Sequence, residues 1–204
     1  MKRSLPALIA LGALLSMQAS AAPMPHIVEQ WNSSQSPDWK PTKVLAIAIL
    51  GDQEIRHRFE DKLVSHLRAR KIAASTSFSL VPDLANPGSR EEILRRVDEQ
   101  QIDGAVTFRL VPLEKGEKAA AAWSEKWKEQ VEAGGTLREL IEETLPFPKQ
   151  KSKRYGVEVT LWGGPAPVRY WAGRTESHTV DELREGASGL VQDVIGILQD
   201  RQRI

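Results

Sequence analysis

The residue types that most often perform chemistry are scattered along this chain without a recognisable catalytic spacing. There is no cysteine, which excludes thiolate metal centres, thiol nucleophiles and disulfide scaffolds. No two histidines stand at the spacing of a helical zinc site, and neither a phosphate-binding glycine loop nor a nucleophile elbow is present. We therefore predict no metal site and no cofactor, and we favour a binding protein over an enzyme.

Three residues nevertheless form a weak candidate ligand site. His66 projects within the apolar stripe of a predicted helix, near the helix C-terminus, where a structural role is the alternative. Glu158 and Glu176 lie on neighbouring predicted strands, and Glu158 should point away from the apolar face of its strand. If these groups converge in space, the chain is a small-ligand-binding protein or a hydrolase-type enzyme whose site is assembled only in three dimensions.

Tryptophan is the more suggestive residue type, since six are present against two tyrosines and four phenylalanines. Trp31 and Trp39 lie in a segment rich in proline and serine, whereas Trp123 and Trp127 share one face of a predicted helix. Exposed aromatic side chains are effective anchors for a protein partner, so these four are the candidate partner-binding residues. The alternative is that they pack against the domain and fix the segments that carry them.

Charge and composition narrow the classes of partner. The 204 residues include 28 lysines and arginines and 27 aspartates and glutamates, a formal net charge of +1. A dedicated nucleic-acid-binding protein carries a basic surplus or a basic stripe, which this sequence lacks. The apolar and charged fractions, 41% and 27%, are those of a folded globular chain.

The first 21 residues are typical of a secretory signal peptide. Lys2 and Arg3 precede an apolar stretch from Leu5 to Met17, and Ala19-Ser20-Ala21 matches a cleavage site. The apolar stretch is shorter than the roughly 20 residues that span a bilayer. We expect cleavage near Ala21, export to the periplasm and no stable membrane anchor. The absence of cysteine also predicts that the protein is not lipidated.

The elements that must position these residues follow from hydrophobic periodicity. Residues 22–42 are expected to form an extended arm, and residues 43–204 a single α/β domain with a helical hairpin inserted at about 112–152. Helices are expected after Asp52, from Ser89 and from Thr179, the last two opened by capping boxes. Five strands are predicted, over residues 44–50, 73–81, 105–111, 155–162 and 169–178.

These elements predict a three-layer α/β/α sandwich around a five-stranded mixed sheet. The continuous apolar run over residues 44–50 is typical of a central strand buried on both faces. Right-handed crossovers then give the strand order 2-1-3-4-5, with strand 4 antiparallel to its neighbours.

Several short motifs carry a resemblance to known proteins. They are Arg56 with Phe59-Glu60, Leu80-Val81-Pro82, Asp103-Gly104 and Trp171. With their surroundings they resemble a family of small exported bacterial envelope proteins and lipoproteins of unknown function, whose fold is similar to the N-terminal domain of TolB. The resemblance covers about residues 43–200 without the insertion. It implies a fold and an envelope location, but no reaction.

The function expected from the sequence is that of a non-enzymatic periplasmic module of the bacterial cell envelope. Its expected role is protein interaction or an accessory function, and its expected partner is an envelope protein or a cell-wall component rather than a nucleic acid. Export, the absence of catalytic motifs and the tryptophans in the arm and the insertion support this expectation.

Overall fold

The computed structural model describes residues 24–33, 39–113, 117–145, 152–163 and 168–204. The predicted signal peptide at 1–21 lies outside the described residues. Among the helices that are described, none combines the length and the apolar character needed to cross a membrane.

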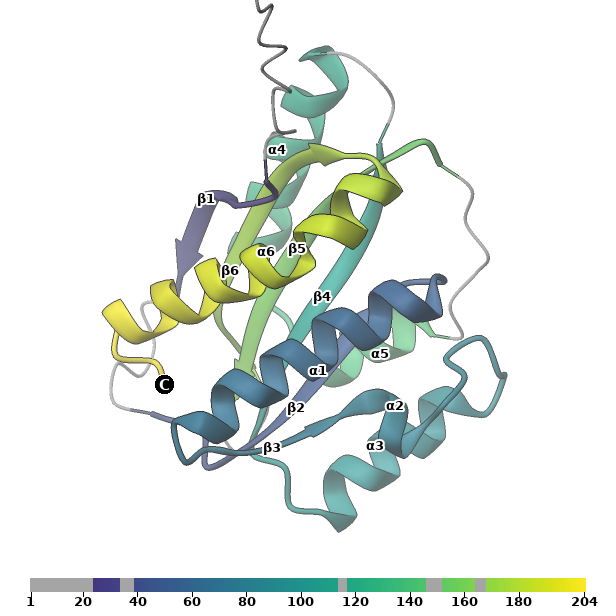
Figure 1. Ribbon diagram of the computed structural model, residues 1–204, viewed down its shortest axis with the longest axis vertical. Helices are drawn as coiled ribbons and strands as arrows, with labels where there is room; N and C mark the ends of the chain where they lie inside the picture. Colours follow the sequence, from purple (N-terminus) through teal and green to yellow (C-terminus); the bar gives the residue numbers. More distant parts are fainter. Residues whose placement is uncertain (1–23, 34–38, 114–116, 146–151, 164–167) are drawn as a thin grey trace, which may run out of the picture.

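A six-stranded mixed sheet forms the centre of the molecule, in the order β1-β6-β5-β4-β2-β3 (Figure 1). β2 is parallel to β3 and to β4, whereas β5 is antiparallel to β4 and β6, and β1 is antiparallel to β6. The strands are β1 (Ile27–Asn32), β2 (Lys43–Ile49), β3 (Ala73–Thr76), β4 (Gly104–Leu113), β5 (Arg154–Gly163) and β6 (Val168–His178).

The prediction of a five-stranded sheet is wrong, because part of the expected arm is a strand. β1 pairs with β6 from Ile27, opposite Thr175, to Asn32, opposite Trp171, and it extends the sheet beyond β6. The proline and serine content of the arm obscured this strand, yet residues 27–32 themselves contain neither residue type. The six-stranded order therefore replaces the predicted order, which ended at the strand over 169–178.

Helices cover both faces of the sheet (Figure 1). α1 and α6 pack on one face, while α3 and α5 pack on the other and α4 lies over β6 through Trp127 and Val131. The helices are α1 (Gln53–Ala69), α2 (Ser77–Leu80), α3 (Ser89–Glu99), α4 (Glu117–Glu132), α5 (Leu137–Thr144) and α6 (Val180–Asp200). The helical insertion expected at about 112–152 contains α4 and α5, and β4 continues as far as Leu113.

Both faces of β2 are buried, as the unbroken apolar run predicts. Val44, Ala46 and Ala48 contribute to the core under α1 and α6, whereas Leu45 and Ile47 contribute to the core under α3 and α5. Side chains alternate between the two faces of a strand, so one apolar run supplies both cores.

The predicted strand over 73–81 ends early. β3 stops at Thr76, whose hydroxyl accepts a hydrogen bond from Ser79 N at 3.3 Å and caps the single helical turn α2. Serine and threonine side chains compete in this way with strand pairing. The capping box predicted at Ser89 is also wrong, because Gly88 occupies the N-cap and Ser89 Oγ donates to Leu84 O instead. The capping box at Thr179 is confirmed.

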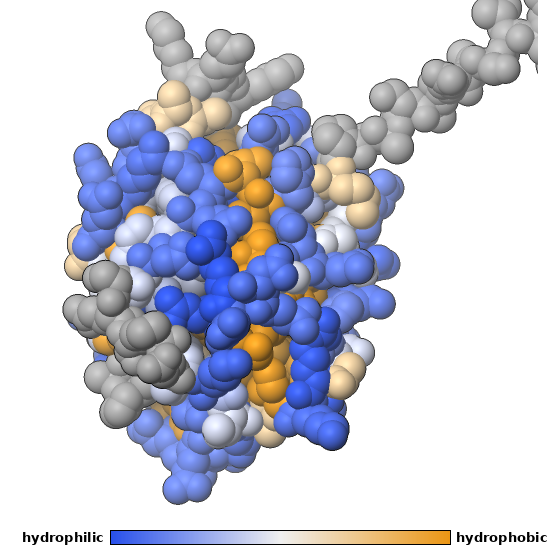
Figure 2. Space-filling view, turned by 90° about the vertical axis from the view of Figure 1, so that its left-hand side faces the viewer, coloured by the Kyte–Doolittle hydropathy of each residue, from blue (hydrophilic) through white to orange (hydrophobic). Residues whose placement is uncertain are grey.

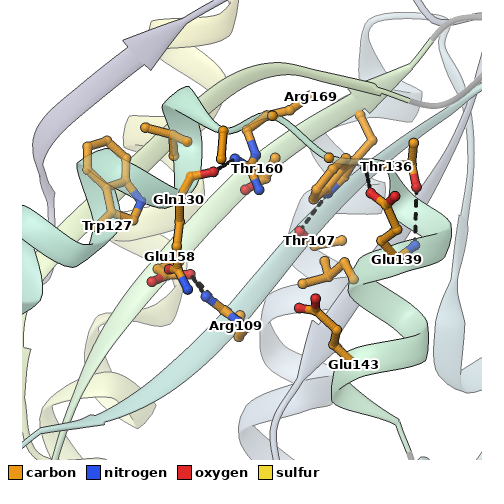
Figure 3. A pocket seen from close by; sticks show the side chains of 16 residues that line it. Thr107, Arg109, Trp127, Gln130, Thr136, Glu139, Glu143, Glu158, Thr160 and Arg169 are labelled. Carbon is orange, nitrogen blue, oxygen red and sulfur yellow. Dashed lines mark hydrogen bonds and ion pairs between the residues drawn. The ribbon is translucent and has the colours of Figure 1, made fainter.

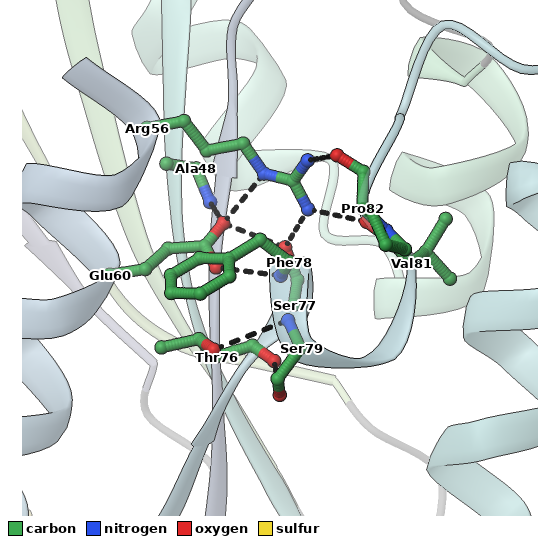
Figure 4. A network of polar contacts seen from close by, with 9 residues as sticks. All are labelled: Ala48, Arg56, Glu60, Thr76, Ser77, Phe78, Ser79, Val81 and Pro82. Atoms are coloured by element: carbon green, nitrogen blue, oxygen red, sulfur yellow. Dashed lines mark hydrogen bonds and ion pairs between the residues drawn. The ribbon is translucent and has the colours of Figure 1, made fainter. Parts of the chain in front are cut away.

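A buried ion pair within α1 is hydrogen-bonded to the segment that follows β3 (Figure 4). Arg56 Nε lies 3.1 Å from Glu60 Oε1, and both side chains are fully buried. Arg56 also donates to the carbonyl oxygens of Val81 and Pro82 and to Ser77 Oγ. These bonds fix the return of the chain from α2 toward α3.

Glu60 completes the network toward β2 and α2. Its carboxylate accepts from Ala48 N at 2.9 Å, from Phe78 N at 3.0 Å and from Ser77 Oγ at 2.6 Å. Burial raises the pKa of this carboxyl, while Arg56 and the hydrogen bonds act in the opposite direction. Arg56 and Glu60, two of the residues that carried the family resemblance, therefore have a structural role.

Candidate functional site

A pocket of about 220 Å³ opens on the face of the sheet that carries α4 and α5 (Figure 3). Its floor is formed by β4 and β5, and its walls by the end of α4, the turn at Gly134 and Gly135, and one side of α5. Figure 3 shows charged side chains entering it from several elements. Those of the lining are Arg109, Glu139, Glu143, Glu158 and Arg169.

A glycine in β5 allows α4 to pack closely against the sheet. A Cβ atom at Gly156 would lie 2.0 Å from the ring of Trp123, so only glycine lets this ring lie directly on the strand. Trp123 and Trp127, one turn apart in α4, are only 6% and 3% exposed. Aromatic packing therefore helps to set the position of the pocket wall, together with the contacts that Ser124 and Lys128 of α4 make with Glu29 of β1.

The turn between α4 and α5 sets the opposite wall. Gly134 and Gly135 adopt positive φ values of 80° and 131°, which favour glycine. α5 then begins with a capping box, in which Thr136 Oγ1 accepts from Glu139 N and Glu139 Oε2 accepts from Thr136 N at 2.7 Å. One carboxylate oxygen of Glu139 is therefore already occupied.

Arg169, on β6, is the unbalanced charge of the pocket. It donates to Gln130 O at 2.6 Å and lies 5.1 Å from the centre of the Trp162 ring, but its buried Nε has no hydrogen-bond partner in the described chain. No carboxylate of the described residues forms an ion pair with it at contact distance. Burial lowers the pKa of Arg169, and the charge of Arg109 acts in the same direction, whereas the charges of Glu158 and Glu143 oppose this shift.

Arg109 and Glu158, by contrast, form an ion pair in which each compensates the charge of the other. They face each other directly across β4 and β5, and Arg109 Nε donates to Glu158 Oε2 at 2.8 Å. The second oxygen of Glu158 accepts from Trp123 Nε1 at 3.3 Å, and the side chain is largely buried. This pair is a fixed element of the pocket floor: its charges compensate each other, although Arg109 has N–H donors beyond those that bind Glu158.

A second, more apolar pocket of about 270 Å³ adjoins the first. The two share the side chains of Arg109, Gln130, Glu143 and Glu158. The additional lining is mainly apolar and comes from Ile49, Leu110, Val111, Pro112 and Trp123, together with Lys126 and Thr144.

The three residues of the weak ligand site predicted from the sequence do not come together. Glu158 lines the pocket, with Arg109 beside it. His66 lies half-buried on α1, which covers the other face of the sheet. Glu176 lies near the end of β6 and lines a separate groove beside Arg154.

The four candidate partner-binding tryptophans pack against the domain. Trp123 and Trp127 are buried under α4, and Trp31 packs beside Trp127. Trp39 stacks on Tyr170 with 4.7 Å between ring centres. In this arrangement the rings fix the N-terminal segment and the insertion, which is the structural alternative.

Sequence reasoning missed Arg109 and Arg169. Neither arginine belongs to a catalytic, metal-binding or aromatic pattern, so the sequence does not single them out. Arg109 follows Phe108 within a strand whose other residues are largely buried, and a charged group there requires a partner or a polar cavity.

This set of residues can hold a ligand by charge and hydrogen bonding. Within the described residues, no group of three or more histidines, aspartates and glutamates is placed to hold a metal ion. Arg169 offers donors to an anionic group, and Thr107 and Thr160 present hydroxyls at the floor.

Comparison with known proteins gives limited guidance. No family model matches the chain, and no curated protein matches it. Two similar solved structures are dodecamers of PelC from Paraburkholderia phytofirmans, one of them a point variant. The variant has a TM-score of 0.42 and 13% identity over 84% of this chain and 96% of that chain. The other has a TM-score of 0.43 and 12% identity over 86% and 98%.

TM-scores at this level carry no argument about the function of this chain. Neither of these two structures is the N-terminal domain of TolB, so the resemblance stated above stays a prediction.

Proposed function

We propose that this chain is a non-catalytic accessory module of the bacterial cell envelope that binds a small ligand through an anionic group. The predicted signal peptide supports the location, since Ala19-Ser20-Ala21 follows an apolar stretch of the right length. The pocket beside Arg169 is the binding site in this proposal.

The state of Arg169 is the observation that carries the proposal. A guanidinium that has lost much of its hydration is costly unless an anion compensates it. Arg169 has an unsatisfied buried Nε and no ion-paired carboxylate in the described chain, and it faces a cavity. Guanidinium groups match carboxylates and phosphates by paired hydrogen bonds, which makes an oxyanion the fitting ligand group.

Calorimetry with simple anions tests this function. Acetate and inorganic phosphate are titrated into the purified protein and into Arg169→Gln, with Arg58→Gln as the matched control. Arg58 lies on α1, on the other face of the sheet, in an exposed pair with Glu54. A hydrogen bond to a charged group contributes about 1.5–3 kcal/mol, so Arg169→Gln should weaken binding at least about tenfold.

The control separates this site from general charge effects. Arg58→Gln removes the same charge and should bind like the unchanged protein. Equal binding by the unchanged protein and Arg169→Gln, or no binding of either anion, would refute the proposal.

A second candidate function, docking of an envelope protein or a cell-wall component, is favoured by the surface around β1. Figure 2 shows an apolar strip running down the side of the molecule on which β1 lies in Figure 1. Val28 of β1 is 39% exposed and lines a groove of about 630 Å³ with Ala120 and Ala121 of α4. A photo-crosslinking residue at Ala120, on the α4 side of this groove, tests this function in intact cells: a crosslinked product should form and should be lost in Val28→Asp.

A further inference from the structure

We propose that the Arg169 pocket selects a zwitterion about as large as a free amino acid, with its carboxylate on Arg169 and its ammonium group on Glu143. This inference rests on the proposed function and names the ligand class of the same site. The ligand class is inferred from the charged side chains of the pocket that have no partner of opposite charge.

Glu143 supplies the carboxylate that would bind the ammonium group of the ligand. It lies in the last turn of α5, is exposed, and lines both adjoining pockets. Figure 3 shows Glu143 and Arg169 entering the pocket from different sides. The charge of Glu143 acts on Arg169, but within the described chain Glu143 makes neither an ion pair nor a hydrogen bond.

The remaining charged groups of the pocket are engaged. Glu158 is held by Arg109 and by Trp123 Nε1, and Glu139 accepts from Thr136 N in the capping box. Among the described residues that line the cavity, Arg169 therefore has no carboxylate partner, although it donates to Gln130 O, and Glu143 has neither an ion pair nor a hydrogen bond. A ligand with charges of both signs compensates both, whereas a simple anion bound at Arg169 is repelled by Glu143.

The size and polarity of the pocket agree with such a ligand. A cavity of about 150 Å³ is known to hold a six-carbon ring, so about 220 Å³ accommodates a molecule the size of a small amino acid. The hydroxyl of Thr107 accepts from Trp162 Nε1 at 2.9 Å, which leaves its own hydrogen free to donate to a bound oxygen. The neighbouring, more apolar pocket shares Glu143 as a lining residue and offers space for an apolar side chain of the ligand.

Calorimetric titration with three matched probes tests the proposal. They are alanine, propionate and ethylamine, which carry both charges, the negative charge alone and the positive charge alone. The purified protein should bind alanine about fivefold more tightly than propionate, as expected for one added ion pair at an exposed carboxylate, and ethylamine most weakly.

Two neighbouring glutamates supply the variant and its control. Glu143→Gln should reduce alanine binding to the level of propionate and leave propionate binding unchanged or stronger. Glu142→Gln removes the same charge from the adjacent position of α5, where Glu142 lies 3.9 Å from Arg138, and should keep the preference for alanine. Thermal unfolding of each variant verifies that it is folded.

The outcomes separate this inference from the proposed function. Equal binding of alanine and propionate, or a preference that survives in Glu143→Gln, overturns the zwitterion while anion binding at Arg169 stands. Absence of binding of all three probes overturns both.

Discussion

Replacement of Glu60 by glutamine should destabilise the protein by about 3–5 kcal/mol, because it leaves the Arg56 guanidinium charged and buried without a counter-charge. The variant also weakens the bonds that Glu60 accepts from the backbone of Ala48 and Phe78. Since a domain is usually stable by only about 5–15 kcal/mol, this loss removes a large fraction of the total.

The same reasoning gives a double-mutant cycle. Arg56→Met alone leaves a buried carboxylate and should cost a similar amount. The double variant Arg56→Met, Glu60→Gln contains neither charge, so its loss should be smaller than the sum of the single losses by about 1–3 kcal/mol. It remains destabilised, because the carbonyl oxygens of Val81 and Pro82 lose the donors that Arg56 supplies.

The assay is urea unfolding at pH 7, followed by tryptophan fluorescence. The matched control is Arg58 with Glu54, a pair at the same i,i+4 spacing on the same helix, with side chains 51% and 56% exposed. Arg58→Gln, which removes only this exposed pair, should change stability by less than about 0.5 kcal/mol. Additive losses in the cycle, or a Glu60→Gln loss as small as that of Arg58→Gln, would refute the assignment of a buried, coupled pair.

Three further predictions concern packing, capping and pH. Gly156→Ala should destabilise the protein by about 1–3 kcal/mol and change its tryptophan fluorescence, because the added Cβ would lie 2.0 Å from the Trp123 ring. The control is Gly196→Ala, where the added Cβ meets nothing within 4 Å. Thr179→Ala should cost about 1 kcal/mol in urea unfolding, through loss of the hydroxyl that accepts from Glu182 N at 3.2 Å. Burial lowers the pKa of His178 below 6.5, so the unfolded chain takes up a proton at higher pH than the folded chain. The contribution of His178 is therefore present above pH 6.5 and lost as the pH falls below it, and His178→Gln should flatten that part of a stability–pH curve; an unchanged curve would contradict this.

The sequence predicts those parts of the fold whose signals lie within a few neighbouring residues. The run from Val44 to Leu50 predicts a strand buried on both faces, and Thr179 with Glu182 predicts a helix start, because each signal lies within a few residues. β1 could not be found this way, since it is defined by pairing with β6, more than 130 residues away in the sequence. Thr76 misled the prediction because a hydroxyl supports either a strand or a cap.

The candidate site was predictable only in part, for a similar reason. Glu158 could be singled out because it is a carboxylate in an apolar strand. Its partner Arg109 depends on the register between β4 and β5, which periodicity does not determine. The approach of Arg169 to α4 depends further on how the insertion folds back, through the turn at Gly134 and Gly135.

The pairing of β1 with β6 also has a consequence for how the molecule assembles. The first strand of the chain lies beside the last one, and Ile27 N donates to Asp193 of α6 at 2.7 Å across 166 positions. β1 therefore cannot dock until nearly the whole polypeptide is available, and a contact of such long range costs loop entropy before it is formed. The N-terminal segment is thus expected to join late in folding, after the other five strands.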